Sequence, residues 1–72
     1  MKQDIRLKTC IVIERDGQYL SRIEMLTNRV VWDPHVYSAY RTRSREKAKQ
    51  AIEKYGGRLM LFNPVVGRVR AL

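Results

Sequence analysis

The first part of the chain alternates apolar and polar residues with the two-residue period of a half-buried β-strand. The alternation runs over residues 5–13 and resumes over residues 19–25, with an Asp-Gly turn signal at residues 16–17. A two-residue loop would mix the apolar and polar faces of the two strands. We therefore expect a three-residue loop, which pairs Ile13 with Tyr19.

A third strand is expected over residues 29–33, after a short turn at residues 27–28 that sets Met25 against Val30 and Ile23 against Trp32. Pro34 ends it because proline has no N–H for the ladder. The apolar face of this meander is expected to carry Ile11, Ile13, Tyr19, Ile23, Met25, Val30 and Trp32. The opposite, exposed face should display Arg6, Lys8, Cys10, Val12, Glu14, Leu20, Arg22, Glu24, Val31 and Asp33.

An amphipathic helix follows the meander. Its apolar stripe consists of Ala48, Ala51, Ile52 and Tyr55, spaced at i, i+3, i+4 and i+7. Thr42 or Ser44 can cap its amino terminus, and the Gly-Gly pair at residues 56–57 ends it.

Residues 58–62 read as a fourth strand, and residues 65–72 as either a hairpin return or a basic tail. The order β-β-β-α-β predicts one α+β domain over residues 1–72, with two layers: an antiparallel meander and a helix packed on its apolar face. The fourth strand is expected to run parallel to an outer strand of the meander, through a right-handed crossover.

With 72 residues and 44% hydrophobic content, the chain is a small globular domain for which homodimerisation is plausible. The single cysteine, Cys10, excludes an internal disulfide and a cysteine-rich zinc site. The sequence contains no apolar run long enough to cross a membrane and no secretory signal. We therefore expect a cytoplasmic protein without a membrane partner.

Charge gives the main functional indication. The formal net charge is +8 and the sequence pI is about 10.3. Residues 11–40 sum to −1, whereas residues 41–50 sum to +4, with Glu46 as their only acid. A basic domain of this kind attracts nucleic acid or an acidic protein.

The candidate binding residues surround the start of the helix. Arg41, Arg43 and Arg45 precede or open it, where free N–H groups can also meet phosphate. Tyr37 or Tyr40 can stack on bases, although Tyr40 can instead fill the seam between helix and sheet. Lys47, Lys49 and Lys54 are interpreted first as a solvated face. The predicted nucleic-acid-binding set is Arg41, Arg43, Arg45, Lys49, Arg68, Arg70, Tyr37 and Tyr40.

Catalysis is not indicated. His35 stands in a loop beside Pro34 without a nucleophile or positioned carboxylate, and Cys10 is expected to be a half-exposed, inert thiol. The acidic residues are scattered, so neither a metal site nor a cofactor is predicted. The sequence therefore predicts a protein that is not an enzyme.

Two resemblances follow. Three strands and a helix with "AYRTRSREKAKQAI" at the junction resemble the small DNA-binding domains of integrases and plant AP2 factors over residues 10–55. This implies groove reading by the sheet, but the expected exposed face has three basic and three acidic residues, so no base-reading residue is carried over. The segments "VVWD", "YSAYRTRSREKA", "YGG" and "FNPVVG" are similar to small uncharacterised proteins of bacterial phages and mobile elements. That similarity implies a bacterial accessory protein.

The leading hypothesis is a non-enzymatic module that contacts nucleic-acid phosphates. The alternative is an accessory module that docks on an acidic surface of a larger complex.

Overall fold

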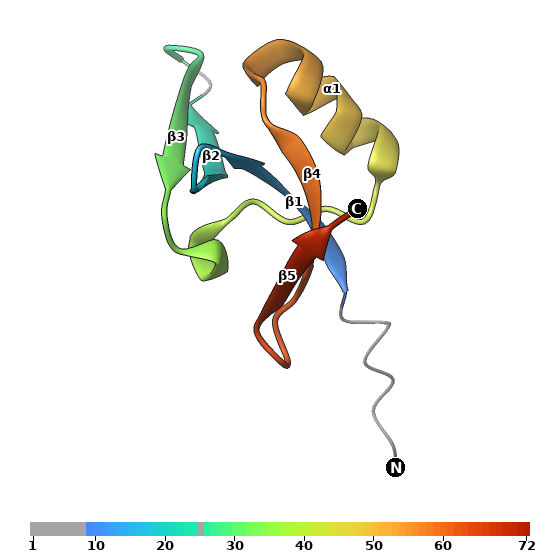
Figure 1. The fold of residues 1–72 in the computed structure, drawn as a ribbon. Helices are drawn as coiled ribbons and strands as arrows, with labels where there is room; N and C mark the ends of the chain where they lie inside the picture. Colours follow the sequence, from blue (N-terminus) through green and yellow to red (C-terminus); the bar gives the residue numbers. More distant parts are fainter. Residues whose placement is uncertain (1–8, 25) are drawn as a thin grey trace.

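The computed structural model describes residues 9–24 and 26–72 (Figure 1). The strand expected to begin at residue 5 and the pairing expected for Met25 therefore lie in part outside the described residues. The elements are β1 (Cys10–Arg15), β2 (Gln18–Glu24), β3 (Arg29–Asp33), the short 3-10 helix η2 (Val36–Ser38), α1 (Arg45–Tyr55), β4 (Arg58–Asn63) and β5 (Arg68–Ala71).

The α+β class is confirmed: the described residues form five strands in the order β3-β2-β1-β4-β5, with α1 between β3 and β4 in sequence. Every neighbouring pair is antiparallel. The expected parallel fourth strand is wrong, because β4 runs antiparallel to β1. Before α1 the chain makes an additional extended pass, in which Thr42 forms an antiparallel bridge with Ile11. Because of this extra pass, α1 and β4 each run in the direction opposite to the one expected.

The turn between β1 and β2 has two residues, so the expected three-residue loop is wrong. Glu14 pairs with Tyr19, and Arg15 pairs with Gln18. Asp16 and Gly17 both have positive φ, 52° and 81°, which is the requirement of a type I′ turn. The longer loop was expected because a two-residue loop places apolar and polar residues on the same face of the hairpin, which would expose apolar side chains. In the structure both faces of β1 are covered, so that objection does not apply.

A β-bulge between Leu20 and Arg22 changes the register of β2 against β3. Leu20 pairs with Trp32, and beyond the bulge Ile23 pairs with Val30. The expected pairing of Ile23 with Trp32 is therefore wrong. The extra residue, Ser21, keeps the side chains of Leu20 and Ile23 on the same face of the sheet.

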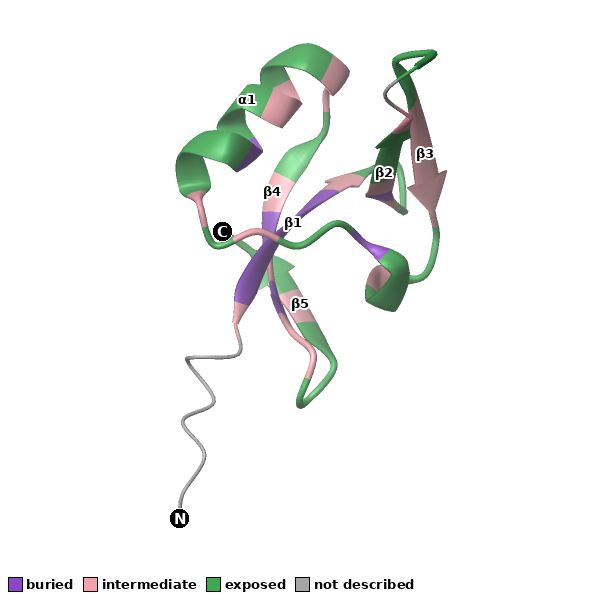
Figure 2. Cartoon of the chain, turned by 180° about the vertical axis from the view of Figure 1, so that it is seen from behind, coloured by how far each residue is buried: buried purple, intermediate pink, exposed green. Residues whose placement is uncertain are grey.

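Strand β1 is buried on both faces (Figure 2). Cys10 and Val12 are 8% and 0% exposed, and they pack with Phe62, Met60 and Ala39 beneath the η2 segment. Ile11 and Ile13 are buried on the other face, toward α1. The expected exposed sheet face is therefore wrong for Cys10 and Val12, because the segment between β3 and α1 folds over them. It is also wrong for Leu20, which is 1% exposed and which the two-residue turn places on the same face as Ile13.

The helix agrees with its sequence pattern. Ser44 is its N-cap, since its hydroxyl oxygen accepts a hydrogen bond from the Lys47 N–H at 3.2 Å. Ala48 is fully buried. The helix packs on β1 and β4. Gly56 ends it with φ 83°, a left-handed conformation that glycine adopts without strain.

The carboxyl-terminal residues form the hairpin return. Asn63 pairs with Arg68 and Phe62 pairs with Val69, across a turn at residues 64–67. Strand β5 is consequently one edge of the sheet, and β3 is the other.

Candidate functional site

One row of paired residues links the expected binding residues across the sheet. Thr42 pairs with Ile11, Ile11 pairs with Leu61, and Leu61 pairs with Arg70. Directly paired residues project to the same face of a sheet. Arg70 therefore lies on the face covered by α1, and so does Arg68, two residues earlier on β5.

Arg41 projects to the opposite face, because it precedes Thr42 in an extended segment. Its guanidinium carbon lies 5.3 Å from the centroid of the Phe62 ring, and its Nη2 donates to the Tyr37 carbonyl oxygen at 3.1 Å. The sequence-based expectation treated the arginines before the helix as one cluster. The structure separates Arg41 from the helix arginine, Arg45.

Arg45 and Lys49 are exposed and lie one turn apart on the same flank of α1. Lys47 and Lys54 occupy the opposite flank. At about 100° per residue around the helix axis, they lie about −100° and −120° from the buried Ala48. The helix thus carries two separate cationic flanks.

The handedness of the chain decides which flank faces β5. Consider the sheet viewed from the side of α1, with β1 running upward. In this view, an L-residue of β1 whose side chain points toward the viewer has its N–H and C=O groups on its right. Ile11 uses both groups to bond Thr42, so β4 and β5 lie on the left. The helix runs upward too, because two glycines connect it to the descending β4. A right-handed helix in that direction turns Arg45 and Lys49 to the left.

Four cationic side chains are therefore brought to one side of the molecule. We call them the β5-side basic surface: Arg45 and Lys49 from α1, and Arg68 and Arg70 from β5. All four are exposed. Within the described part of the chain, the ion pairs are Arg58–Glu14, Arg22–Glu24 and Arg15–Asp16, and no member of this surface belongs to them.

Arg41 and Arg43 also shape the environment of the buried thiol. Cys10 Sγ lies 3.4 Å from the Phe62 carbonyl oxygen, which accepts its hydrogen bond. Burial raises the pKa of Cys10, while the positive charges of Arg41 and Arg43 act in the opposite direction. The expected half-exposed thiol is corrected to a buried one.

The two tyrosines have different roles. The Tyr37 hydroxyl donates to the Pro64 carbonyl oxygen at 3.2 Å, and its ring meets Phe62 edge to face with centroids 5.2 Å apart. Tyr37 therefore ties η2 to the β4–β5 hairpin. Tyr40 is held by its backbone, whose N–H donates to the Leu20 carbonyl oxygen at 2.8 Å. Its side chain lines an open pocket.

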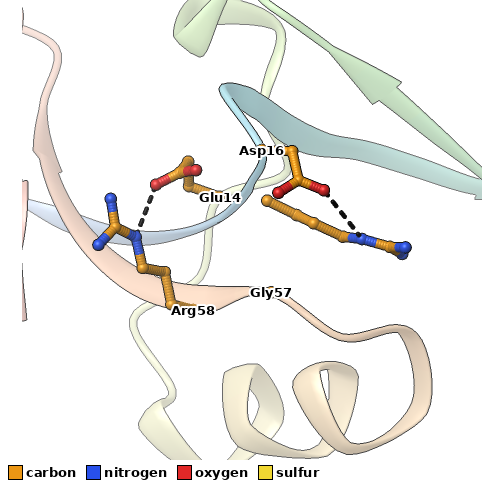
Figure 3. Close-up of a pocket in the computed structure, with 5 residues that line it drawn as sticks. Glu14, Asp16, Gly57 and Arg58 are labelled. Carbon is orange, nitrogen blue, oxygen red and sulfur yellow. Dashed lines mark hydrogen bonds and ion pairs between the residues drawn. The ribbon is translucent and has the colours of Figure 1, made fainter.

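The opposite end of the sheet is neutralised internally. Glu14 accepts from Arg58 Nε at 2.7 Å and from the Gly17 N–H at 3.1 Å. Both hydrogen bonds lower the pKa of Glu14, the Gly17 N–H most. A pocket of about 380 Å³ lies here, lined by Glu14, Arg15, Asp16, Gly57 and Arg58 (Figure 3). Among the described residues that line it, two cations and two carboxylates balance, so this lining gives no net attraction to an anion.

No set of three or more histidine, cysteine or acidic side chains suited to a metal occurs among the described residues. His35 is exposed, and its backbone N–H donates to Asp33 Oδ1 at 2.7 Å. No helix among residues 9–24 and 26–72 is long and apolar enough to cross a membrane.

Comparisons with known proteins give no relative: no family model matches the chain, and neither the curated proteins nor the solved structures contain a significant match.

Sequence reasoning did not anticipate the pocket beside Tyr40 or the separation of Arg41 from Arg45. The separation has a signal in the sequence, because residues of an extended segment alternate between faces and the helix begins only after Ser44. The pocket depends on the bulge in β2, which has no local signal.

Proposed function

We propose that the protein is a non-enzymatic module that binds the phosphate backbone of nucleic acids through its β5-side basic surface. One observation carries the proposal: Arg45, Lys49, Arg68 and Arg70 share one side, outside the ion pairs of the described residues. The carboxylates of Glu14 and Asp16 occupy the far end of the sheet. Charge separation of this kind steers a polyanion to one side of the protein.

Contacts through arginine and lysine side chains alone imply binding that depends strongly on salt and weakly on sequence. Groove reading by the sheet, which the likeness to integrase domains implied, receives no support, because Val12 and Leu20 are buried. Arg41 and Arg43 lie on the other face and are expected to contribute less than the four residues of the β5-side basic surface.

The test is fluorescence anisotropy with labelled single- and double-stranded oligonucleotides over a range of salt concentrations. We expect the double variant Arg68→Ala/Arg70→Ala to weaken binding and to reduce the slope of log K against log salt by roughly 2, about one for each phosphate contact. Lys47→Ala/Lys54→Ala is the matched control, because it removes the same charge from the opposite flank of α1. Equal losses in both variants, or no binding by the wild type, would contradict the proposal.

The alternative, docking on an acidic protein, is favoured by the position of β5 at an edge of the sheet. An extended acidic peptide can add to such an edge and place carboxylates near Arg68 and Arg70. Ala71→Pro separates the two functions. On the handedness derived above, the Ala71 N–H points away from β4, so proline removes a group that strand addition needs and phosphate binding does not. Loss of binding to an acidic partner with unchanged oligonucleotide binding would favour the alternative.

A further inference from the structure

We infer that the pocket beside Tyr40 holds one unpaired nucleobase, so that the protein prefers single-stranded to double-stranded nucleic acid. The inference rests on the proposed function, which is nucleic-acid binding, and adds to it a preference for single strands over duplexes. It assigns to Tyr40 the stacking role that the sequence divided between two tyrosines.

The pocket has the lining that a base requires. Its volume is about 290 Å³, and Leu20, Ser21, Arg22, Ile23 and Tyr40 surround it. Tyr40 and Ile23 are 42% and 37% exposed, so an aromatic ring and an aliphatic side chain are open to a flat ligand. A nucleobase stacks on such a surface whatever its sequence, because every base has a π-face.

The pocket is also held in place by the protein itself. The Tyr40 N–H donates to the Leu20 carbonyl oxygen, and the Ser21 hydroxyl donates to the Ser38 carbonyl oxygen at 2.9 Å. These two bonds fix the segment around Ala39 against the bulged part of β2. Little conformational entropy is therefore lost when a ligand enters.

The charge at the rim of the pocket suits a nucleotide. Among the described residues of its lining, Arg22 is the only charged one. Its Nη2 lies 3.6 Å from Glu24 Oε1, in a pair whose side chains are 71% and 42% exposed. An exposed pair of this kind is weak, so Arg22 can exchange its carboxylate partner for a phosphate.

Tyr37 does not offer the same site, because its hydroxyl and ring edge are already engaged with Pro64 and Phe62. The path between the pocket and the β5-side basic surface follows residues 40–45. Even if every residue of this path were extended, at about 3.3 Å per residue it would span at most roughly 17 Å, a distance that a single strand of several nucleotides covers.

The experiment compares four labelled probes of equal length at low salt: single-stranded DNA, single-stranded RNA, duplex DNA and a DNA strand of abasic sugar-phosphate units. We expect both base-containing single strands to bind more tightly than the duplex and the abasic strand. Tyr40→Ala should weaken single-strand binding about 5- to 100-fold and leave abasic binding unchanged, whereas Tyr40→Phe retains the ring and the affinity. Tyr37→Phe is the matched control and should bind as the wild type does.

Photocrosslinking of wild-type protein to a strand containing 5-iodouracil gives a second measurement that needs no variant to fold. We expect crosslinks at Tyr40 or its pocket neighbours. Equal binding of the abasic and base-containing strands, or crosslinks confined to other elements, overturns the pocket while phosphate binding stands. Absence of binding to all four probes removes the proposed function, and the pocket inference with it.

Discussion

The guanidinium carbon of Arg41 lies 5.3 Å from the centre of the Phe62 ring, on the side of the sheet opposite α1. The same guanidinium donates to the Tyr37 carbonyl oxygen. Arg41 therefore connects the segment before the helix to the η2 turn and to β4. Its first role is in packing, although the sequence suggested a role in anion binding.

We expect Arg41→Ala to lower the free energy of unfolding by about 0.5–1 kcal/mol, because a partly exposed cation–π contact and one hydrogen bond are lost. Urea denaturation measures the change. Arg29→Ala, an exposed arginine at the start of β3, is the control and should have little effect. A loss in oligonucleotide binding larger than that of Arg68→Ala/Arg70→Ala would show that Arg41 belongs to the binding surface after all.

Gly57 is expected to tolerate no side chain. It has φ +100°, and an added Cβ would lie 2.8 Å from Ile13 Cγ2 and 3.0 Å from the Glu14 carbonyl oxygen. Gly57→Ala should therefore lower the free energy of unfolding by about 2–4 kcal/mol, from backbone strain and overpacking together.

Gly17→Ala provides the comparison for Gly57, because Gly17 also has positive φ, +81°, but no atom within 4 Å of an added Cβ. Only backbone strain applies there, and a loss of about 1 kcal/mol is expected. Thermal or urea unfolding of both variants measures the difference. Equal destabilisation would mean that the contact with Ile13 relaxes freely.

Stability should fall at acidic pH in part because of Glu14. The pKa of Glu14 is lower in the folded state than in the unfolded state, so the ionised carboxylate stabilises the fold. This contribution to the free energy of unfolding is complete above the unfolded-state pKa and is lost as the pH falls through the folded-state pKa. Urea unfolding between about pH 3 and pH 7 measures this loss. Glu14→Gln should flatten the acidic limb of the profile.

Arg58→Ala refines the same measurement, because it removes one partner of Glu14 and leaves the Gly17 N–H in place. The variant should keep part of the pH dependence, since the Gly17 N–H still lowers the pKa of Glu14 when the hydrogen bond and the charge of Arg58 are removed. An acidic limb unchanged in Glu14→Gln would assign the dependence to other groups.

Cys10 should react slowly with thiol reagents in the folded protein at neutral pH. It is 8% exposed and burial raises its pKa, so little thiolate is accessible. The rate of alkylation, followed by mass spectrometry, should rise steeply when denaturant unfolds the chain. A native rate close to that of the unfolded chain would place the thiol at the surface.

The sequence predicted the local features of the fold and missed the features that depend on distant contacts. The helix and its glycine stop follow from residues close in the chain, and of the two expected caps, Thr42 and Ser44, the structure uses Ser44. The turn at Asp16-Gly17 was recognised, but its length was wrong because the argument assumed that β1 has one exposed face. Only tertiary structure shows that the η2 segment covers that face.

The candidate site was also predicted only in part, because it too depends on contacts between residues far apart in the chain. The basic residues were recognised from composition, but their grouping depends on the pass through Thr42 and on the pairing of β4 with β5. These relationships join residues far apart in the chain. Tyr40 was named as one of two stacking candidates. Two tertiary features distinguish it from Tyr37: the pocket beside the bulge in β2, and the contacts that Tyr37 makes with Pro64 and Phe62.

The bridge between Ile11 and Thr42 has a consequence for amide hydrogen exchange. Cys10, Ile11 and Val12 all pair with β4. The Ile11 N–H donates to the Thr42 carbonyl oxygen at 2.7 Å, whereas the N–H groups of Cys10 and Val12 point the other way, toward β4. Detachment of the segment before α1 would release the Ile11 amide to deuterium while the neighbouring amides stayed protected. Adjacent positions on one central strand would then report two different opening events, one for the segment before α1 and one for the sheet.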